Sequence, residues 1–333
     1  MLQYLIIILD DMSTSYCHYN NRNHSPKLIS IEDLKVGIFF AMKENLMVEF
    51  VYPDYELPTE YKEVINTIDH GTIVPSLCKD KSLISGADVI VIDKWEDIEV
   101  LSIIIDAAYV LRTCKVDLFA KYEAITPLLD KMKRLNIVIT DVEDFTEADF
   151  ETYNNMLSSL SRIVEQMYVE GKSPQLNLLT DRMVLDKMNN CNAGWESIAL
   201  APDGRFYVCP AFYHAQKIDG KESSIGEECE RGYSIGDLEL GLDIKNPQLY
   251  RLDYAKLCRD CDAYQCKRCI WLNRKTTFEV STPSHEQCVV ANIERNASKI
   301  LLNNIRQHGE FLPNKPEIKE IKYLDPFESK KQW

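Results

Sequence analysis

The sequence predicts an α/β fold in its first part and a smaller cysteine-rich region behind it. Short apolar runs alternate with amphipathic stretches over residues 1–185, which is the pattern of strands followed by helices. Eight of the 11 cysteines fall between residues 191 and 288, where helical patterns become few. At 333 residues the chain is long enough for about two domains. We therefore expect one domain over residues 1–185, a second over 186–310 and a tail over 311–333.

Strands are expected where short apolar runs end at polar or turn-forming residues. Residues 4–9 carry no basic flank and stop at Asp10 and Asp11, so we interpret them as a buried strand and not as a signal peptide. The other runs lie at 47–53, 71–75, 87–93, 107–113 and 136–141, with 174–180 as a candidate for a seventh.

Amphipathic stretches between these runs predict helices at residues 30–45, 58–68, 118–135 and 146–171. Thr146 is expected to cap the last of them, with Asp149 three residues on. Strands that alternate with helices favour a parallel sheet with right-handed crossovers. The pattern suits a partial or full (β/α) barrel or an open doubly wound sheet. In the cysteine-rich region, helices are expected at 244–257 and 288–308.

The composition is that of a globular protein, with 45% hydrophobic and 27% charged residues. Its net charge of -14 argues against nucleic acid as a general partner, because binding nucleic acid requires a basic surface. No stretch approaches the ~20 apolar residues of a membrane span, so we expect no membrane partner. We expect a cytoplasmic location, where disulfides are rare and clustered thiols indicate metal binding.

The most compact cysteine motif is Cys258-x2-Cys261-x4-Cys266-x2-Cys269. Two residues between thiols let one turn present both sulfurs to a metal. Two such pairs only four residues apart are crowded for one zinc ribbon, in which the pairs stand ~15–20 residues apart. The crowding makes sense if the thiols are shared between two iron–sulfur clusters, as in bacterial ferredoxins. Zinc stays an alternative, because thiolates suit both.

The wider pattern resembles the SPASM domain, a C-terminal extension of radical SAM peptide-modifying enzymes that usually carries two auxiliary clusters. The pattern runs Cys191-x12-Gly204-x4-Cys209, then the motif at 258–269, then Cys288. IALAPDGRFYVCP at 198–210 is similar to the hairpin of that domain, and YSIGDLE at 233–239 is similar to its link to the compact motif. The SPASM motif is usually C-x2-C-x5-C-x3-C, so this chain is one residue short in each of the last two gaps.

The resemblance implies one ligand set for each cluster. One [4Fe–4S] cluster would be held by Cys258, Cys261, Cys266 and Cys288. The other would be held by Cys191, Cys209 and Cys269, with Cys229 or His214 as a candidate fourth ligand. An open iron that takes a substrate thiolate is the alternative to a fourth protein ligand. Three roles remain open for these clusters. They could stabilise the domain or dock a partner, relay electrons, or bind the substrate directly.

Radical SAM enzymes carry C-x3-C-x2-C in the loop after their first strand, where three thiolates hold a cluster that binds S-adenosylmethionine (AdoMet). The corresponding loop of this chain reads DDMSTSYCHYNN. Counting back from Cys17, the other two positions are Thr14 and Asp10, whose oxygens do not replace thiolates on a soft cluster iron. The first part therefore resembles a radical SAM domain that lacks its cluster motif, and we expect no AdoMet binding.

Over most of its length the chain resembles the CXXX repeat peptide maturases. The residues that carry this resemblance are LIIILDDMSTSYCHYNN, FVYPDYELPTEYKEVINTIDH and the cysteine-rich region. The resemblance implies an accessory role in the maturation of a ribosomally synthesised, Cys-rich precursor peptide (RiPP biosynthesis), together with a separate radical SAM enzyme. A stand-alone peptide-modifying enzyme and a zinc-stapled interaction module are the alternatives. The sequence assigns no catalytic residue, and it has no G-x-G-x-x-G motif, Walker loop or nucleophile elbow.

Overall fold

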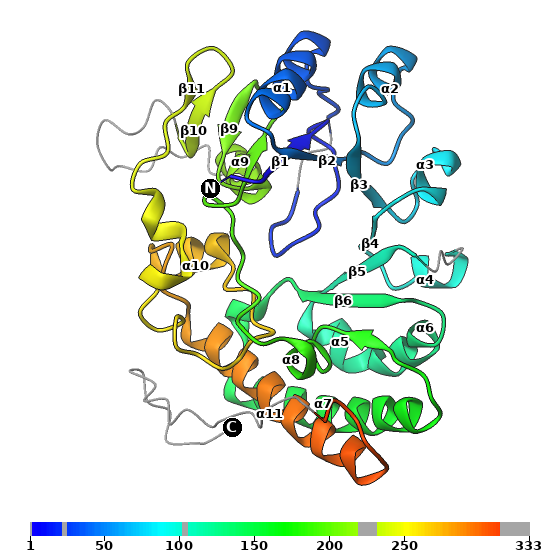
Figure 1. Ribbon diagram of the computed structural model, residues 1–333. Coiled ribbons are helices and arrows are strands. Elements are labelled where there is room, and N and C mark those ends of the chain that lie inside the picture. The colour runs from blue at the N-terminus through cyan, green and yellow to red at the C-terminus, as the bar shows by residue number, and fades with distance from the viewer. Residues whose placement is uncertain (1, 22–24, 102–105, 219–231, 314–333) are drawn as a thin grey trace. The chain divides into compact units, whose positions relative to one another are not determined.

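The computed structural model describes residues 2–21, 25–101, 106–218 and 232–313 (Figure 1). The chain forms two compact units, and each unit combines an earlier and a later stretch of the sequence. Unit 1 comprises Met1–Ser102 and Asn192–Arg251, and unit 2 comprises Ile103–Cys191 and Leu252–Trp333. The domain boundaries expected near residues 185 and 310 rest on composition and resemblance, and they stay a prediction.

Unit 1 is built on a mixed sheet with the strand order β11-β10-β9-β8-β1-β2-β3-β4. The strands from β8 to β4 in this order are parallel, whereas β9, β10 and β11 are added antiparallel. The bounds are β1 Tyr4–Ile8, β2 Met47–Val51, β3 His70–Pro75, β4 Val89–Ile92, β8 Ser197–Leu200, β9 Arg205–Tyr207, β10 Ser234–Asp237 and β11 Gly241–Leu242. The first four confirm predicted strands, and β1 is almost fully buried, as expected for a parallel strand covered on both faces.

The helices of unit 1 are α1 Ile31–Lys43, α2 Thr59–Ile65, α3 Lys81–Ser85, α4 Asp97–Val100 and α9 Pro210–Ile218, with the 3-10 helix η4 Pro247–Tyr250. Three of them, α1 to α3, connect its parallel strands along the chain, and the others follow β4, β9 or β11. Ser30 caps α1, because its side chain accepts a hydrogen bond from the Asp33 N–H. Gly37 allows α1 to pack closely on β8, since a Cβ atom at this position would overlap the Leu200 side chain.

The segment between Cys191 and Cys209 contains the expected hairpin, because β8 and β9 pair antiparallel. Gly204 adopts the left-handed φ of 76° that the turn requires, and its N–H donates to the Ala201 carbonyl at 3.0 Å. The Tyr207 hydroxyl donates to Asp203 Oδ2 at 2.7 Å, which fixes the turn to the strand that follows. The segment similar to the SPASM link supplies β10, which pairs with β9.

Unit 2 combines a short parallel sheet with two long helices. Its strands, in the order β5-β6-β7, are Ala108–Thr113, Arg134–Ile139 and Gln175–Leu176. Its helices are α5 Lys115–Lys121, α6 Thr126–Leu129, α7 Glu147–Val169, α8 Asp181–Val184, α10 Ile270–Thr277 and α11 His285–Gln307, with 3-10 helices η1 Tyr122–Ile125, η2 Val142–Asp144 and η5 Leu252–Tyr254. The predicted cap of α7 is confirmed as a capping box between Thr146 and Asp149.

The two long helices of unit 2, α7 and α11, are joined by a buried polar contact. The Tyr153 hydroxyl on α7 donates to Glu294 Oε1 on α11 at 2.7 Å. Gln265 Nε2 donates to the other oxygen of this carboxyl group at 3.3 Å and to the Ala291 carbonyl at 2.7 Å. The Gln265 side chain therefore ties the loop that contains the cysteine motif to α11.

Two predicted helices are wrong in extent. Residues 118–135 do not form one helix, because Pro127 has no N–H and the chain there divides into α5, η1 and α6 before β6 begins at Arg134. Residues 244–257 hold the 3-10 helices η4 and η5, since Asn246 is left-handed and Arg251 is extended. The candidate strand at 174–180 shortens to the two residues of β7.

No helix in the described part of the chain combines the length and the apolarity that a membrane crossing requires.

Candidate iron–sulfur site

Four cysteines of unit 2 line one pocket. They are the four residues that the SPASM resemblance implies for a single cluster, namely Cys258, Cys261, Cys266 and Cys288. The cavity between these side chains has a volume of about 30 Å³ and is partly open to solvent. Apolar side chains complete its wall, among them Met188, Leu257, Pro283 and Ala291. Cys258 and Cys288 are far apart in the sequence, and the fold brings both of them into this pocket.

Tight turns carry three of these thiols, and a helix carries the fourth. The N–H groups of Cys258, Cys261 and Cys266 each donate to the carbonyl three residues earlier, at 2.9 to 3.0 Å. Cys288 lies in the first turn of α11, whose N-cap Ser284 accepts a hydrogen bond from the Gln287 N–H. Short hydrogen-bonded turns therefore position the sulfurs of Cys258, Cys261 and Cys266, and no strand contributes to them.

Backbone N–H groups already point at two of the four sulfurs. The Ala263 N–H donates to Cys261 Sγ at 3.5 Å, and the Arg268 N–H donates to Cys266 Sγ at 3.4 Å. A hydrogen bond to sulfur favours the charged form over the neutral thiol, and such bonds also help to set the reduction potential of an iron–sulfur cluster. The backbone around this pocket is therefore arranged for negatively charged sulfur.

Burial works against that charge. It raises the pKa of Cys258 to about 11 and the pKa of Cys266 to about 12, and it raises the pKa of Cys261 above its usual value. Cys258 itself is only 7% exposed. Because a thiolate is the form that binds metal, metal binding at this pocket must release protons.

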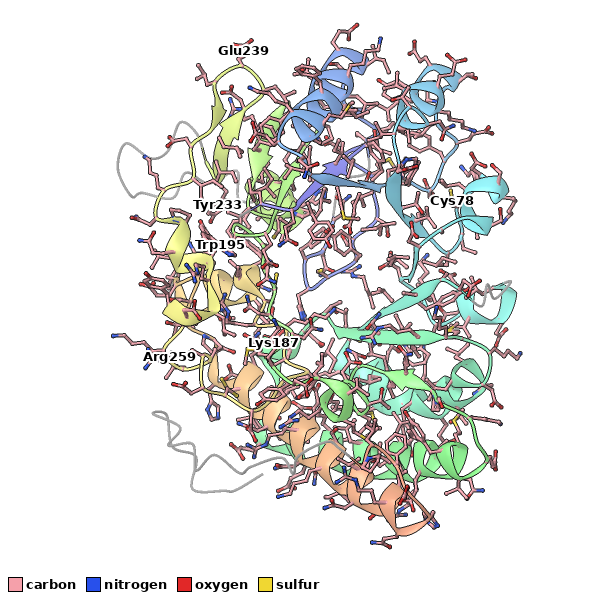
Figure 2. All side chains as sticks on the ribbon, in the orientation of Figure 1. Cys78, Lys187, Trp195, Tyr233, Glu239 and Arg259 are labelled. Atoms are coloured by element: carbon pink, nitrogen blue, oxygen red, sulfur yellow. The ribbon has the colours of Figure 1, made fainter. Side chains whose placement is uncertain are left out.

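Three charged residues line the pocket among those that the structure describes. Arg295 Nη1 lies 2.8 Å from Asp262 Oδ1, so these two charges compensate each other. The third is Arg268, which is fully buried and whose Nε donates to Asn190 Oδ1 at 2.6 Å. By contrast Arg259, in the same cysteine motif, is exposed and pairs with its neighbour Asp260 (Figure 2). The lining therefore carries one positive charge in excess, although the chain as a whole is strongly acidic.

The residues predicted for the other cluster are divided between the two units. Cys191 and Cys269 belong to unit 2, where the Cys191 N–H donates to the Lys267 carbonyl at 2.5 Å and Cys269 is the N-cap of α10. Cys209 and His214 belong to unit 1, directly before and within α9. Cys229 lies outside the described residues. This ligand set stays a prediction.

His214 lies in an aromatic environment of unit 1. It is 2% exposed and its ring stacks on Tyr19 with the centroids 5.4 Å apart. The preceding residue, Tyr213, is also buried, and its hydroxyl donates to the Asp11 carboxylate. These contacts link α9 to the loop that follows β1.

That loop is stabilised by its own oxygen-bearing side chains. Asp10 Oδ1 accepts a hydrogen bond from the Met12 N–H at 2.7 Å, and Ser13 Oγ donates to the Val51 carbonyl at 2.7 Å. The Thr14 N–H donates to the Tyr52 carbonyl at 3.0 Å. Asp10 is fully buried, and burial is the main reason why its pKa is raised. Two of the positions where radical SAM enzymes place thiolates are thus occupied by buried oxygen-bearing side chains, of which Asp10 accepts a backbone hydrogen bond.

Within the described residues, no group of three His, Cys, Asp or Glu side chains is arranged to hold a single metal ion. A [4Fe–4S] cluster makes a different demand, because each of its four irons takes its own thiolate. The lining of one pocket by four thiols, with backbone donors to sulfur and an excess positive charge, suits that demand.

Sequence reasoning did not single out Arg268, Arg295 or Asp262. The sequence signal for Arg268 was its place between two cysteines of the motif. This signal is weak, because most arginines in proteins are exposed. Arg295 and Asp262 meet only because α11 packs beside the cysteine motif.

Solved structures of similar fold are those of anSMEcpe. The native protein with bound AdoMet and Cp18Cys peptide aligns with a TM-score of 0.58 at 11% identity, over 92% of this chain and 100% of that one. The histidine-tagged protein with AdoMet aligns with a TM-score of 0.58 at 11% identity, over 92% and 96%. The native protein with AdoMet aligns with a TM-score of 0.58 at 12% identity, over 91% and 99%.

No protein-family model matches the chain, and a comparison with curated proteins finds no match. The structural likeness confirms the expected α/β class with a parallel, radical SAM-like core. The resemblance to CXXX repeat maturases stays a prediction. The same holds for the expectation that this chain binds no AdoMet, which differs from the bound state of the similar structures.

Proposed function

We propose that this chain is an iron–sulfur protein of peptide maturation, with one [4Fe–4S] cluster held by Cys258, Cys261, Cys266 and Cys288. The observation that carries the proposal is the convergence of these four thiols on one pocket of unit 2. A cluster bound there would supply one-electron transfer. The residues of the chain would hold it, exclude water from it with an apolar wall and offer N–H groups to its cysteine sulfurs.

We further propose a second cluster on Cys191, Cys209 and Cys269. Its remaining iron would take Cys229, His214 or a thiolate of the substrate. A substrate ligand of this kind would suit a Cys-rich peptide, because thiolate is the ligand that cluster iron prefers.

The proposed role is that of an accessory maturase that works with a separate radical SAM enzyme on a ribosomally synthesised, Cys-rich precursor. The fold shared with anSMEcpe, which has been solved with a bound peptide, supports a peptide as the substrate class. The buried oxygens of Asp10 and Thr14, at two positions where radical SAM enzymes place thiolates, support the need for a partner that starts the radical chemistry. The net charge of -14 favours a basic leader peptide or a basic partner face through electrostatic steering.

Metal analysis tests the first part. Protein purified anaerobically or reconstituted with iron and sulfide should hold about eight irons per chain if both clusters form. It should show a broad visible absorption band that dithionite bleaches. Stoichiometric zinc with no iron after anaerobic preparation would contradict the proposal and favour a zinc-stapled interaction module.

Incubation with AdoMet and dithionite tests the absence of radical initiation. The chain alone should form no 5′-deoxyadenosine above the background of a reaction without protein. Steady formation of 5′-deoxyadenosine would show that the chain is itself a radical SAM enzyme and that the alignment of its first loop is wrong.

Co-purification tests the partnership. With clusters intact, the chain should bind the radical SAM enzyme and the precursor peptide encoded beside it, and the binding should weaken as salt rises. If neither binds at micromolar concentration, a stand-alone activity becomes the better explanation.

A further inference from the structure

A buried arginine lies in the cluster pocket at a backbone position that does not favour arginine. Arg268 has a φ of 44°, in the left-handed region that glycine and asparagine adopt most readily. It is nevertheless 0% exposed and has the largest side chain among the fully buried residues that the structure describes. Because glycine would take this backbone conformation with less strain, the side chain itself must contribute something in the folded protein.

The surroundings of the guanidinium indicate what that contribution is. Arg268 lines the same pocket as the four thiols, and its charge would act on the thiolates of Cys258, Cys191 and Cys266 once a bound cluster has removed their protons. Its backbone N–H donates to Cys266 Sγ, so the same residue offers both a hydrogen bond and a full charge to the sulfur side of the pocket. Its Nε is oriented by the neutral amide oxygen of Asn190.

Two other guanidinium groups near the motif have partners of their own, although both also act on the Cys261 thiol. The Arg295 guanidinium is paired with Asp262 at 2.8 Å. Arg182 is also buried, but its Nε donates to the Asp262 carbonyl at 2.5 Å and its guanidinium carbon lies 4.0 Å from the centre of the Tyr264 ring. Arg268 therefore supplies the excess positive charge of the pocket lining.

We propose that Arg268 is the charge-compensating residue of the cluster site, which stabilises the bound cluster and most strongly its one-electron-reduced form. This inference rests on the proposed function, because it presupposes an iron–sulfur cluster on the four thiolates. One-electron reduction by an external reductant adds one negative charge to the cluster. A buried guanidinium nearby favours that added charge because the surroundings screen it poorly. Arg268 thus raises the reduction potential of this cluster.

The test is a reduction titration with dithionite, followed by electron paramagnetic resonance, on the anaerobic full-length chain. The signal of the pocket cluster is identified as the one that Cys266→Ala abolishes. Arg268→Gln removes the charge at similar size, Arg268→Lys keeps the charge, and Arg259→Gln removes an exposed charge from the same motif. We expect Arg268→Gln to shift the reduction equilibrium at least tenfold toward the oxidised cluster, which is about 59 mV for one electron. Arg268→Lys should retain most of the wild-type potential, and Arg259→Gln should change it little because solvent screens its charge.

Failure to load the cluster is informative as well. If Arg268→Gln holds no pocket cluster while Arg268→Lys does, the charge is required to hold the cluster and the proposal is supported. An unchanged potential in Arg268→Gln overturns the proposal, and so does loss of the cluster in both Arg268 variants, which would assign the residue a role of shape alone. A wild-type chain without iron would instead refute the proposed function itself.

Discussion

The loop after β1 in unit 1 and the cysteine motif in unit 2 bury polar side chains in opposite ways. In the loop, the side chains of Asp10 and Ser13 form hydrogen bonds with backbone groups of the same unit. In the cysteine motif the direction is reversed, because backbone N–H groups are directed at the sulfurs of Cys261 and Cys266. In the loop after β1, side chains form hydrogen bonds with backbone groups. In the cysteine motif, backbone N–H groups form hydrogen bonds with the sulfurs that are proposed to bind a cluster.

This difference indicates where metal contributes to folding. Residues 255–269 have no helix or strand, and a small apolar cluster of Met188, Ala255 and Cys258 packs within this region. Burial keeps the thiols there neutral, at a pKa of about 11 for Cys258 and about 12 for Cys266. Metal binding would convert this poorly supported segment into a fixed one, since the binding free energy of such sites is folding free energy.

The strongest test of the comparison removes one thiol from each segment. Cys266→Ala should lose the pocket cluster, which is about half of the bound iron if two [4Fe–4S] clusters form. It should also increase amide hydrogen exchange across residues 252–291, because metal no longer holds the motif. Cys17→Ala, in the loop after β1, should leave iron content and exchange unchanged. Equal losses in the two variants would refute the contrast between the segments.

A second test concerns a buried carboxyl group next to the cysteine motif. Burial raises the pKa of Glu294 to about 7, although the hydrogen bonds from Tyr153 and Gln265 oppose the shift. The folded state therefore keeps a proton that the unfolded state loses above a pH of about 4.5. The stabilisation is complete below that pH and is lost as the pH rises through 7, by about 3 kcal/mol in all.

Glu294→Gln should abolish this dependence. Above pH 8 it should be more stable than the wild type by about 2 kcal/mol in urea unfolding, and the difference should shrink toward pH 5. The exposed Glu151→Gln on the same helix pair should change stability by less than about 0.5 kcal/mol at any pH. A constant difference between Glu294→Gln and the wild type from pH 5 to 8 would show that Glu294 does not titrate in this range.

A third test addresses the packing of α1 on β8 in unit 1, which involves none of the proposed cluster ligands. Gly37→Ala should destabilise unit 1 by about 1 to 3 kcal/mol, because the added methyl group must displace the buried Leu200 side chain between α1 and β8. The effect should be the same in the iron-loaded and iron-free protein. Gly86→Ala is the matched control, since a Cβ at Gly86 meets nothing within 4 Å. An effect that depends on iron loading would contradict the assignment of this stability to packing.

The smallest expected effect concerns the start of α7 in unit 2. Thr146→Ala should cost about 1 kcal/mol, because it removes one half of the capping box with Asp149. Lys115 also holds Asp149, at 2.8 Å, so the helix start keeps part of its support. Thermal unfolding of the variant measures the loss, and Thr146→Ser, which restores a hydroxyl, should recover most of it.

Much of the fold could be predicted because periodic patterns report local structure. The apolar runs matched β1 to β6, and the polar signature at Thr146 matched the start of α7. The helices α9 and α10 were not predicted, because each is short and directly follows a cysteine. Both segments were interpreted as parts of a metal site. The expected helices at 118–135 and 244–257 failed where Pro127 and the left-handed Asn246 interrupt an otherwise helical composition.

Part of the candidate site could be predicted from the sequence, and part of it could not. The spacing of Cys258, Cys261 and Cys266 predicted neighbouring thiols, because turns of a few residues are local. No local rule places Cys288 beside them, since that depends on how α11 packs within unit 2.

By itself the sequence determined the α/β alternation, the hairpin between Cys191 and Cys209 and the identity of the thiols, because each depends on residues close together in the chain. Only the tertiary structure decided that four of those thiols share one pocket and that Arg268 is buried among them. It also decided that the Asp10 side chain is buried and accepts a hydrogen bond from the Met12 N–H. Burial and long-range pairing arise from packing between segments far apart in sequence, and this packing sets the charge and the pKa values on which the chemistry of the site depends.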